Sequence, residues 1–288
     1  MKYLLLLTGF FSFCRLAGQE KRKVLDKVTG TPVSYVTIKV LHSERGVIGS
    51  ADGEFTITTE PGDSILFTCA GYKPIIVPGN KIGDTVYMVR IMIELKPGVI
   101  GTERPTGTIT IGNEEKIVKG DITWGPSPSG SYDEFAQKMV LPDSAARFKI
   151  KKVLIPVKKL RCTGSLLLRV YYPDSSADQP GLQVLNKLVH GAGLDVNKGI
   201  STIDVDGDNL FFYGADSFFI SITWPPEAFR EKCLTGIMLS GHSESQTYSR
   251  TLTISSFQWF SFVGRFKDKN GNNFEPRTFF AVEAEMYR

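Results

Sequence analysis

One serine lies in a segment that could carry nucleophilic chemistry. Residues 241–245 read Gly-His-Ser-Glu-Ser, which begins like the G-x-S-x-G turn that exposes the catalytic serine of many hydrolases. The segment ends in Ser245 instead of glycine, and that turn requires a strand-to-helix junction in an α/β sheet. Because the surrounding sequence is polar or strand-like, we expect Ser243 to lie in a surface loop and not to act as a nucleophile.

The sequence does not indicate a zinc-dependent reaction either. The chain has three histidines, His42, His190 and His242. None lies in the H-x-x-E, H-x-H or H-E-x-x-H spacing by which closely spaced His and Glu supply zinc ligands and orient water in a carboxypeptidase-type site. No cysteine lies within a few residues of another, so a structural zinc site is not indicated. The sequence therefore predicts no metal and no cofactor.

Three alternating carboxylates form a candidate calcium loop. Asp204, Asp206 and Asp208 would supply hard oxygen ligands at alternate positions, as at the start of an EF-hand loop. The glycine of such a loop is replaced by Asn209, and its bidentate glutamate is replaced by Ala215. We interpret the segment as a turn that follows a strand, with calcium binding kept open as the alternative.

Aromatic side chains could form a sugar-binding platform, because their flat apolar faces stack on sugar rings. The candidates are Trp124, Tyr171, Tyr172, Trp224 and Trp259. Trp224 and Trp259 lie in apolar strand patterns and are expected in the core. Trp124 lies among polar, glycine and proline residues, so it is the weak candidate for an exposed binding residue. The ligand is unknown from the sequence.

The first residues have the pattern of a secretory signal. Lys2 provides a positive start, residues 3–13 form an apolar run, and small residues lead up to Gly18. The run is too short for a stable transmembrane helix. We therefore expect residues 1–18 to be a signal peptide. The mature protein is expected to be periplasmic, outer-membrane-associated or secreted, with no transmembrane segment.

Charge gives no indication of a nucleic-acid partner. The formal net charge is +4, and removal of Lys2 and Arg15 with the signal would leave about +2, with acids and bases interspersed. Nucleic-acid binders concentrate basic residues on one face. The short basic run at residues 21–23 is interpreted as a solvated tail.

The cysteine count excludes a scaffold built on disulfides. Removal of the signal leaves Cys69, Cys162 and Cys233, an odd number, so at least one thiol stays unpaired within a monomer. Cys69 lies in an apolar strand pattern and is expected to be a small core residue. Cys162 and Cys233 could pair in an oxidising compartment, and the sequence leaves this open.

The first third of the chain has the pattern of short β-strands. Val36, Ile38 and Val40 alternate with polar or less apolar neighbours, which is the period-two signature of a strand. Asp52-Gly53 is a strong two-residue hairpin signal. Strands are predicted at residues 33–41, 54–58, 64–69, 72–77 and 85–95. Such spacing, with turns between the strands, is typical of a small β-sandwich.

Three motifs in this region resemble the carboxypeptidase regulatory-like domain. Residues 26–33, Asp-Lys-Val-Thr-Gly-Thr-Pro-Val, match its D-x-x-T-G-x-P-hydrophobic opening. Residues 49–57, Gly-Ser-Ala-Asp-Gly-Glu-Phe-Thr-Ile, approximately match its G-T-x-x-D-G-x-F hairpin, with one residue fewer and Ser50 in place of threonine. Residues 62–72 match its G-D-x-L-x-F-S-x-x-G-Y segment, with Ile65 and Thr68 as departures.

The resemblance covers residues 19–96 and implies a transthyretin-like β-sandwich. In carboxypeptidases this module lies beside the catalytic domain, so the resemblance implies an accessory role and no activity of its own. Residues 97–134 are rich in proline and glycine and are predicted to be a linker. A short hairpin, formed by residues 108–111 and 116–118, could interrupt this linker.

Residues 135–288 are predicted to form a larger, jelly-roll-like β-sandwich of eight strands. The fold class is therefore all-β, with two sandwiches in sequence. The predicted strands are 146–157, 164–172, 185–188, 200–205, 217–224, 234–239 and 279–286. Only residues 227–232 indicate a helical turn. The order of modules is similar to that of uncharacterised bacterial envelope proteins.

These features predict a non-catalytic secreted or envelope-associated protein. The C-terminal sandwich would bind a protein or glycan partner at the cell envelope, and the N-terminal module would be accessory. The alternative is a hydrolase whose pair of acids is assembled in the C-terminal sandwich. Such a pair can come from distant strands and needs no local motif.

Overall fold

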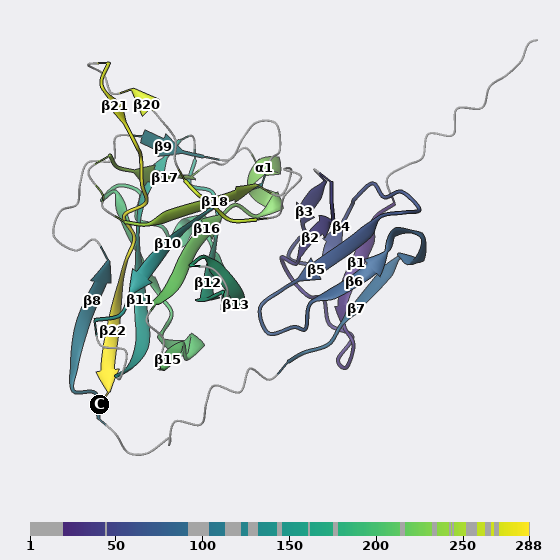
Figure 1. Cartoon of the computed structure of the whole chain (residues 1–288), viewed down its shortest axis with the longest axis horizontal. Helices are drawn as coiled ribbons and strands as arrows, with labels where there is room; N and C mark the ends of the chain where they lie inside the picture. Colours follow the sequence, from purple (N-terminus) through teal and green to yellow (C-terminus); the bar gives the residue numbers. More distant parts are fainter. Residues whose placement is uncertain are drawn as a thin grey trace, which may run out of the picture.

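The computed structural model describes most of the chain from Glu20 to Tyr287 (Figure 1). The described residues are 20–43, 45–91, 104–112, 122–125, 132–142, 146–160, 162–174, 178–213, 217–231, 235–241, 243, 245–251, 258–262, 266–267 and 271–287. The expected signal peptide and the second strand of the expected linker hairpin lie outside them. As predicted, the fold is all-β, with several sheets in a sandwich-like arrangement.

The N-terminal part contains two small sheets in the described residues. One has the order β4-β1-β7 and the other β3-β2-β5-β6. The strands are β1 (Arg22–Asp26), β2 (Thr37–Val40), β3 (Gly46–Ile48), β4 (Glu54–Phe55), β5 (Ser64–Thr68), β6 (Ile75–Pro78) and β7 (Thr85–Met88). The alternating side chains of β2 place Ile38 and Val40 in a fully buried core that also contains Phe67. Residues 33–36 of the first expected strand are outside β2.

The basic run at residues 21–23 is not a tail, which corrects the interpretation from sequence. Arg22 and Lys23 begin β1, the central strand of its sheet, which pairs antiparallel with β4 and parallel with β7. Val24 is fully buried and holds the strand in the core. Lys21 and Lys23 both pair with Glu54 on β4, so their charges are matched within the sheet.

The turn predicted at Asp52-Gly53 forms, but it is not a simple hairpin. Gly53 has a φ of 69°, and its N–H donates to the carbonyl of Ser50 at 3.0 Å. The strand that follows, β4, pairs with β1 and does not return along β3. A two-residue hairpin was the wrong interpretation, because the turn carries the chain from one sheet to the other.

Asp26 gives the opening motif a structural role. Its buried carboxylate accepts the backbone N–H groups of Val28 and Thr29 at 2.8 and 2.9 Å. The second oxygen accepts Tyr72 Oη at 3.1 Å and Arg90 Nε at 2.5 Å. The Thr29 N–H, with these other donors, holds the pKa of Asp26 well below its usual range despite burial. The first and last motifs therefore meet at one carboxylate.

The C-terminal part consists of two larger antiparallel sheets in the described residues. Their orders are β13-β12-β16-β10-β18-β19 and β8-β22-β11-β17-β9, and β14 and β15 also pair with β11. The main strands are β8 (Gly107–Gly112), β9 (Ile122–Trp124), β10 (Asp133–Val140), β11 (Arg147–Lys159), β12 (Leu166–Pro173), β13 (Pro180–Val189), β14 (Ile200–Asp204), β15 (Phe211–Tyr213), β16 (Ser217–Thr223), β17 (Thr235–Leu239), β18 (Thr247–Thr251), β19 (Phe260–Ser261) and β22 (Ala281–Tyr287). These sheets exceed the eight strands expected.

Strands also occur where a linker was predicted. β8 pairs with β22 along six positions, and β9 pairs with β17. β10 begins at Asp133 and is an internal strand of its sheet, with β16 on one side and β18 on the other. The segment 97–134 therefore contributes strands to the C-terminal sheets. The proline and glycine content had indicated turns, and it concealed short strands between them.

The remaining described elements are small. A short hairpin joins β20 (Phe266–Lys267) and β21 (Asn273–Phe274), and three 3₁₀ turns connect strands: η1 (Gly79–Lys81), η2 (Gly191–Gly193) and η3 (Asp206–Asp208). The expected helical turn is α1 (Pro226–Glu231). Across the described ranges, no helix is long and apolar enough to cross a membrane.

Candidate functional site

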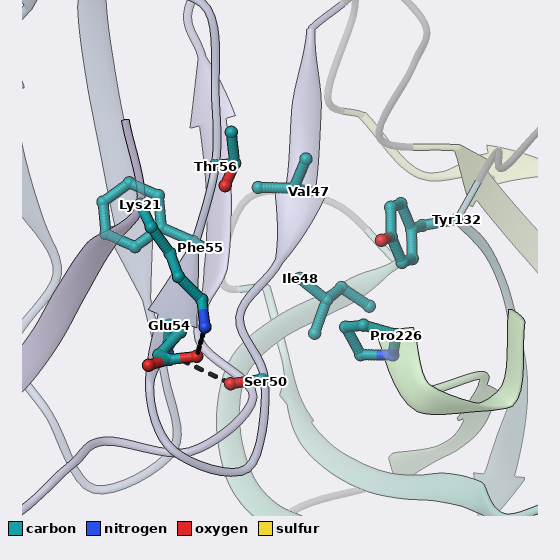
Figure 2. A pocket seen from close by; sticks show the side chains of 9 residues that line it. All are labelled: Lys21, Val47, Ile48, Ser50, Glu54, Phe55, Thr56, Tyr132 and Pro226. Atoms are coloured by element: carbon teal, nitrogen blue, oxygen red, sulfur yellow. Dashed lines mark hydrogen bonds and ion pairs between the residues drawn. The ribbon is translucent and has the colours of Figure 1, made fainter. Parts of the chain in front are cut away.

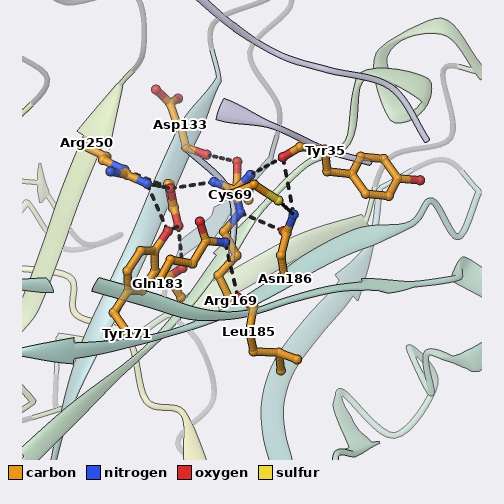
Figure 3. Close-up of polar contacts among 12 residues, drawn as sticks. Tyr35, Cys69, Asp133, Arg169, Tyr171, Gln183, Leu185, Asn186 and Arg250 are labelled. Atoms are coloured by element: carbon orange, nitrogen blue, oxygen red, sulfur yellow. Dashed lines mark hydrogen bonds and ion pairs between the residues drawn. The ribbon is translucent and has the colours of Figure 1, made fainter. Parts of the chain in front are cut away.

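A group of polar side chains lies on the face of the six-stranded sheet that points away from the C-terminal core. Glu134 is on β10, Arg169 and Tyr171 are on β12, Ser221 is on β16 and Arg250 is on β18. Side chains alternate along strands, and the registers place Glu134 opposite Arg250 and Arg169 opposite Ser221. Neighbouring strands thus bring the five side chains together, and Figure 3 shows Arg169, Tyr171 and Arg250 among them. We call them the Glu134 network.

The carboxylate of Glu134 is fully engaged in this network. Its Oε2 accepts Arg250 Nη2 and Nε at 2.7 and 2.9 Å and Arg169 Nη1 at 3.2 Å. Its Oε1 accepts Ser221 Oγ at 2.5 Å and Tyr171 Oη at 2.7 Å. Glu134 is 3% exposed and Arg169 is 1% exposed. A buried carboxylate with five donors has no lone pair left for a substrate proton.

The electrostatics keep Glu134 ionised. Burial by itself raises the pKa of Glu134, but Arg250 and Arg169, with the Ser221 and Tyr171 hydroxyls, outweigh it and lower the pKa to about 2. Burial also raises the pKa of Tyr171, so its hydroxyl stays protonated and donates. The guanidinium of Arg250 lies 4.3 Å from the ring centroid of Trp259, which covers it. The arrangement favours a fixed ion cluster over an acid–base catalyst.

A pH dependence of stability follows from Glu134. Its pKa falls from an ordinary 4.5 to about 2 on folding, so the folded state is favoured above pH 4.5 and this advantage is lost as the pH falls toward 2. The shift corresponds to about 3 kcal/mol. Urea unfolding of the wild type and of Glu134→Gln across this range should show a flatter pH slope for the variant. Equal slopes would contradict this account of the network.

The Glu134 network continues into the N-terminal sandwich through the backbone of Tyr35. The Tyr35 carbonyl accepts Arg169 Nη2 and Asn186 Nδ2, both at 3.3 Å, and Asn186 Oδ1 accepts Arg169 Nε at 3.1 Å. Tyr35 has a φ of 56°, a left-handed conformation that is uncommon outside glycine, asparagine and aspartate. This conformation is accompanied by two side-chain hydrogen bonds from the other sandwich to the Tyr35 carbonyl.

Apolar contacts surround the same joint. Tyr35, Ile48 and Leu167 are buried together in one cluster that includes residues from both sandwiches. On its margin, the N–H of Ala51 donates to Glu227 Oε1 of α1 at 3.2 Å. Burial is the largest cause of a raised pKa at Tyr35, and the negative charge of Glu227 is the second. Together they raise this pKa to about 12. The two sandwiches are therefore in direct contact (Figure 1).

Two pockets lie beside this joint. The first, of about 130 Å³, is lined by Lys21, Ser50 and Glu54 on one side and by Tyr132 and Pro226 on the other (Figure 2). We call it the small pocket. The second, of about 300 Å³, lies between the 32–34 and 69–72 segments and residues 184–186 of β13. We call it the edge pocket.

The free thiol Cys69 lines the edge pocket. Cys69 is partly buried against the N-terminal core, and its Sγ lies 3.9 Å from Asn186 Nδ2. Burial raises the pKa of the Cys69 thiol, which lowers its reactivity. Cys162 is disulfide-bonded. Cys233 lies outside the described residues, so its pairing with Cys162, which the sequence leaves open, stays open.

Ser243 is not in an exposed loop, which corrects the sequence interpretation. It is 7% exposed, and its Oγ donates to the carbonyl of Thr278 at 2.8 Å. Ser245 Oγ donates to the same carbonyl, and Thr247 Oγ1 lies 2.9 Å from Thr278 Oγ1. The hydroxyls hold two chain segments together, which explains their burial. His242 and Glu244 lie outside the described residues.

The carboxylates of the candidate calcium loop are matched by lysines. Asp206 pairs with two lysines of β11 at 2.5 and 2.8 Å, and Asp208 pairs with Lys187 at 2.6 Å. Asp204 Oδ1 accepts the N–H of Asp206, which closes the turn at 2.9 Å. In the part of the chain that the structure covers, no three metal-ligating side chains form a group. The turn interpretation fits these contacts.

The tryptophans pack against other side chains. Trp224 is fully buried and Trp259 is 8% exposed, as expected for core residues. Trp124 is half-buried and does not stand free. Its ring lies edge-on to Phe135 at 5.3 Å and to Phe262 at 6.0 Å. A binding role for Trp124 stays a prediction.

Sequence reasoning did not single out Glu134, Arg169 or Arg250. Each lies at an alternate position of a strand. Arg169 has the apolar neighbours Leu168 and Val170 on the opposite face, and Glu134 follows Asp133 and precedes Phe135. A charged residue inside such a pattern was the available signal. Charged side chains at such positions usually face solvent, so the pattern does not reveal that they bind one another.

Comparisons with known proteins do not identify a family. No family model and no curated protein matches the chain. A crystal structure of the T13 particle of infectious bursal disease virus aligns over 93% of this chain and 61% of its own, with 10% identity and a TM-score of 0.27. The virus's VP2 subviral particle aligns over 93% and 63%, with 11% identity and a TM-score of 0.25. At these scores the alignments do not establish a common fold.

Proposed function

We propose that this chain is a non-catalytic binding protein of the cell envelope or the secreted fraction. The C-terminal sandwich would carry the binding surface for a protein or glycan. The N-terminal sandwich, which resembles the carboxypeptidase regulatory-like domain, would be an accessory module fixed against it. Export rests on the signal pattern of residues 1–18.

The ionised state of the buried Glu134 carboxylate is the observation that supports this proposal most. A hydrolase with an acid pair needs two carboxyl groups whose pKa values differ, one of them protonated near neutral pH. Glu134 is instead surrounded by Arg169, Arg250 and two hydroxyls, and its pKa is lowered to about 2. This favours a structural role for Glu134, the most deeply buried acid among the described residues of the C-terminal sandwich.

A paired screen tests the proposal. The mature protein is applied to a glycan array and to a panel of candidate protein partners, and the same preparation is assayed against hydrolase substrates. The proposal expects saturable binding without turnover. Turnover that disappears when one Asp or Glu of the C-terminal sandwich is substituted would establish the hydrolase alternative. The Glu283→Gln variant is the matched control, because that carboxylate pairs with Lys152 in a partly exposed position.

A further inference from the structure

The edge pocket has the size and position of a ligand site. Its volume of about 300 Å³ is at the lower end of the range for small-molecule sites. One wall is formed by residues 184–186 of β13, and the other by Ser34 and the turn from Cys69 to Tyr72. The pocket therefore lies between the two sandwiches, next to the joint at Tyr35.

In the described part of the chain, the β13 wall is the free edge of a sheet. β13 pairs with β12 and is the first strand in the order of its sheet. A strand with one neighbour directs half of its backbone N–H and carbonyl groups away from the sheet. The register skips Val184, because Val170 faces Leu185 and Tyr171 faces Gln183. Val184 is thus the extra residue of a bulge, outside the ladder, and it lines the pocket.

The lining of the edge pocket is uncharged throughout its ten residues. The side chain with the most hydrogen-bonding capacity is Asn186, and its amide is already engaged by Tyr35 and Arg169. A sugar would need several free side-chain donors and acceptors, which this lining does not offer. The polar partners that the pocket does offer are backbone groups of β13, flanked by apolar side chains such as Val184 and Leu185. Among them, the Leu185 carbonyl already accepts Gln183 Nε2 at 3.2 Å.

We propose that the edge pocket binds an extended, uncharged peptide segment of a partner protein, which adds as a strand to the free edge of β13. In this mode backbone hydrogen bonds provide affinity, and alternate side chains enter the pocket. The inference rests on the proposed binding function and names the chemistry of the partner. Cys69 would lie beneath the bound segment.

Selection from a phage-displayed random peptide library on the mature protein tests this site. Uncharged peptides with period-two patterns are expected. Synthetic versions should bind and slow the alkylation of Cys69, followed by mass spectrometry of the peptide that contains it. N-methylation of alternate peptide amides should abolish binding, because it removes the donors to β13.

Substitutions in the edge pocket test whether the selected peptides bind there. Val184→Lys places a charge in the pocket and should weaken binding about tenfold or more, equivalent to about 1.4 kcal/mol. Val140→Lys, on β10 and 61% exposed, lies outside the pocket lining, so it is the control and should bind as the wild type does. Ala70→Trp fills the pocket from the opposite wall, so the test stands even where Val184→Lys does not fold.

Selected peptides that bind both pocket variants as tightly as the wild type would overturn the inference. Failure to select any peptide would also overturn it. A positive glycan array without turnover would then leave the proposed function standing with a different site. Hydrolysis of substrates would remove the proposed function itself, independently of the peptide result.

Discussion

Replacing Glu134 with alanine is expected to lower the free energy of unfolding by about 3–5 kcal/mol, because two buried guanidinium groups lose their counter-ion. Arg169 and Arg250 are 1% and 8% exposed and contribute three of the five hydrogen bonds to Glu134. A water in the space left by the carboxylate would accept some of these hydrogen bonds, but it would leave both positive charges without a counter-ion. Tyr171 and Ser221 also lose their acceptor. Urea unfolding at neutral pH measures the change.

The control for this prediction is an ion pair of similar length at the surface. Glu283 Oε2 and Lys152 Nζ are 2.7 Å apart, with side chains 33% and 44% exposed. Exposed pairs contribute about 0–1 kcal/mol, so Glu283→Ala should change stability little. A Glu134→Ala variant that loses no more than this control would show that the network does not stabilise the fold.

Gly53→Ala is expected to destabilise the protein by about 2–5 kcal/mol. The φ of 69° is unfavourable for alanine, at about 1–2 kcal/mol. A Cβ at this position would lie 2.6 Å from the carbonyl oxygen of Val24 and 3.2 Å from that of Val33. Both contacts are with backbone, so relief requires β1 to move, which adds about 1–3 kcal/mol. Thermal or urea unfolding of the wild type and of Gly53→Ala measures this change in the free energy of unfolding.

Two other glycines separate the cost of the positive φ from the cost of the steric contacts. Gly30 has a φ of 69° with no heavy atom within 4 Å of a built Cβ, so Gly30→Ala measures the conformational cost alone. Gly62 has the same open surroundings without a positive φ, so Gly62→Ala should be within about 0.5 kcal/mol of the wild type. Equal losses for Gly53→Ala and Gly30→Ala would show that β1 accommodates the methyl group.

The strands that sequence predicted well are those with strong apolar alternation or continuous apolar runs. All residues of β16 are buried. The strand was expected at residues 217–224 and is found at Ser217–Thr223. β11 was expected at residues 146–157 and is found at Arg147–Lys159. In these strands burial of apolar side chains determines the structure, and the residue types report it directly.

Two of the four strands that carry the Glu134 network, β10 and β18, were not predicted. β10 contains Glu134, Gln137 and Lys138, and β18 reads Thr-Tyr-Ser-Arg-Thr, without an aliphatic residue. Their outward face is buried through ion pairs and hydroxyls instead of apolar contacts. A hydrophobic pattern cannot reveal partners that come from strands far apart in the chain, such as Glu134 and Arg250.

The joint at Tyr35 was equally inaccessible from sequence. Left-handed backbone is expected at glycine, asparagine or aspartate, and Val33 to Leu41 had been interpreted as one continuous strand. The contacts of the Tyr35 carbonyl with Arg169 and Asn186 depend on how two separate sandwiches pack. Tertiary packing therefore overrides the local preference of this residue.

We propose that this chain binds its partner without reacting with it. To test this, the ligand identified by the paired screen is incubated with a stoichiometric amount of mature protein, and both are recovered for mass spectrometry. We expect a ligand of unchanged mass and a protein without a covalent adduct. A ligand cleaved with the uptake of one water, in a reaction abolished by substituting one acid of the C-terminal sandwich, would contradict it.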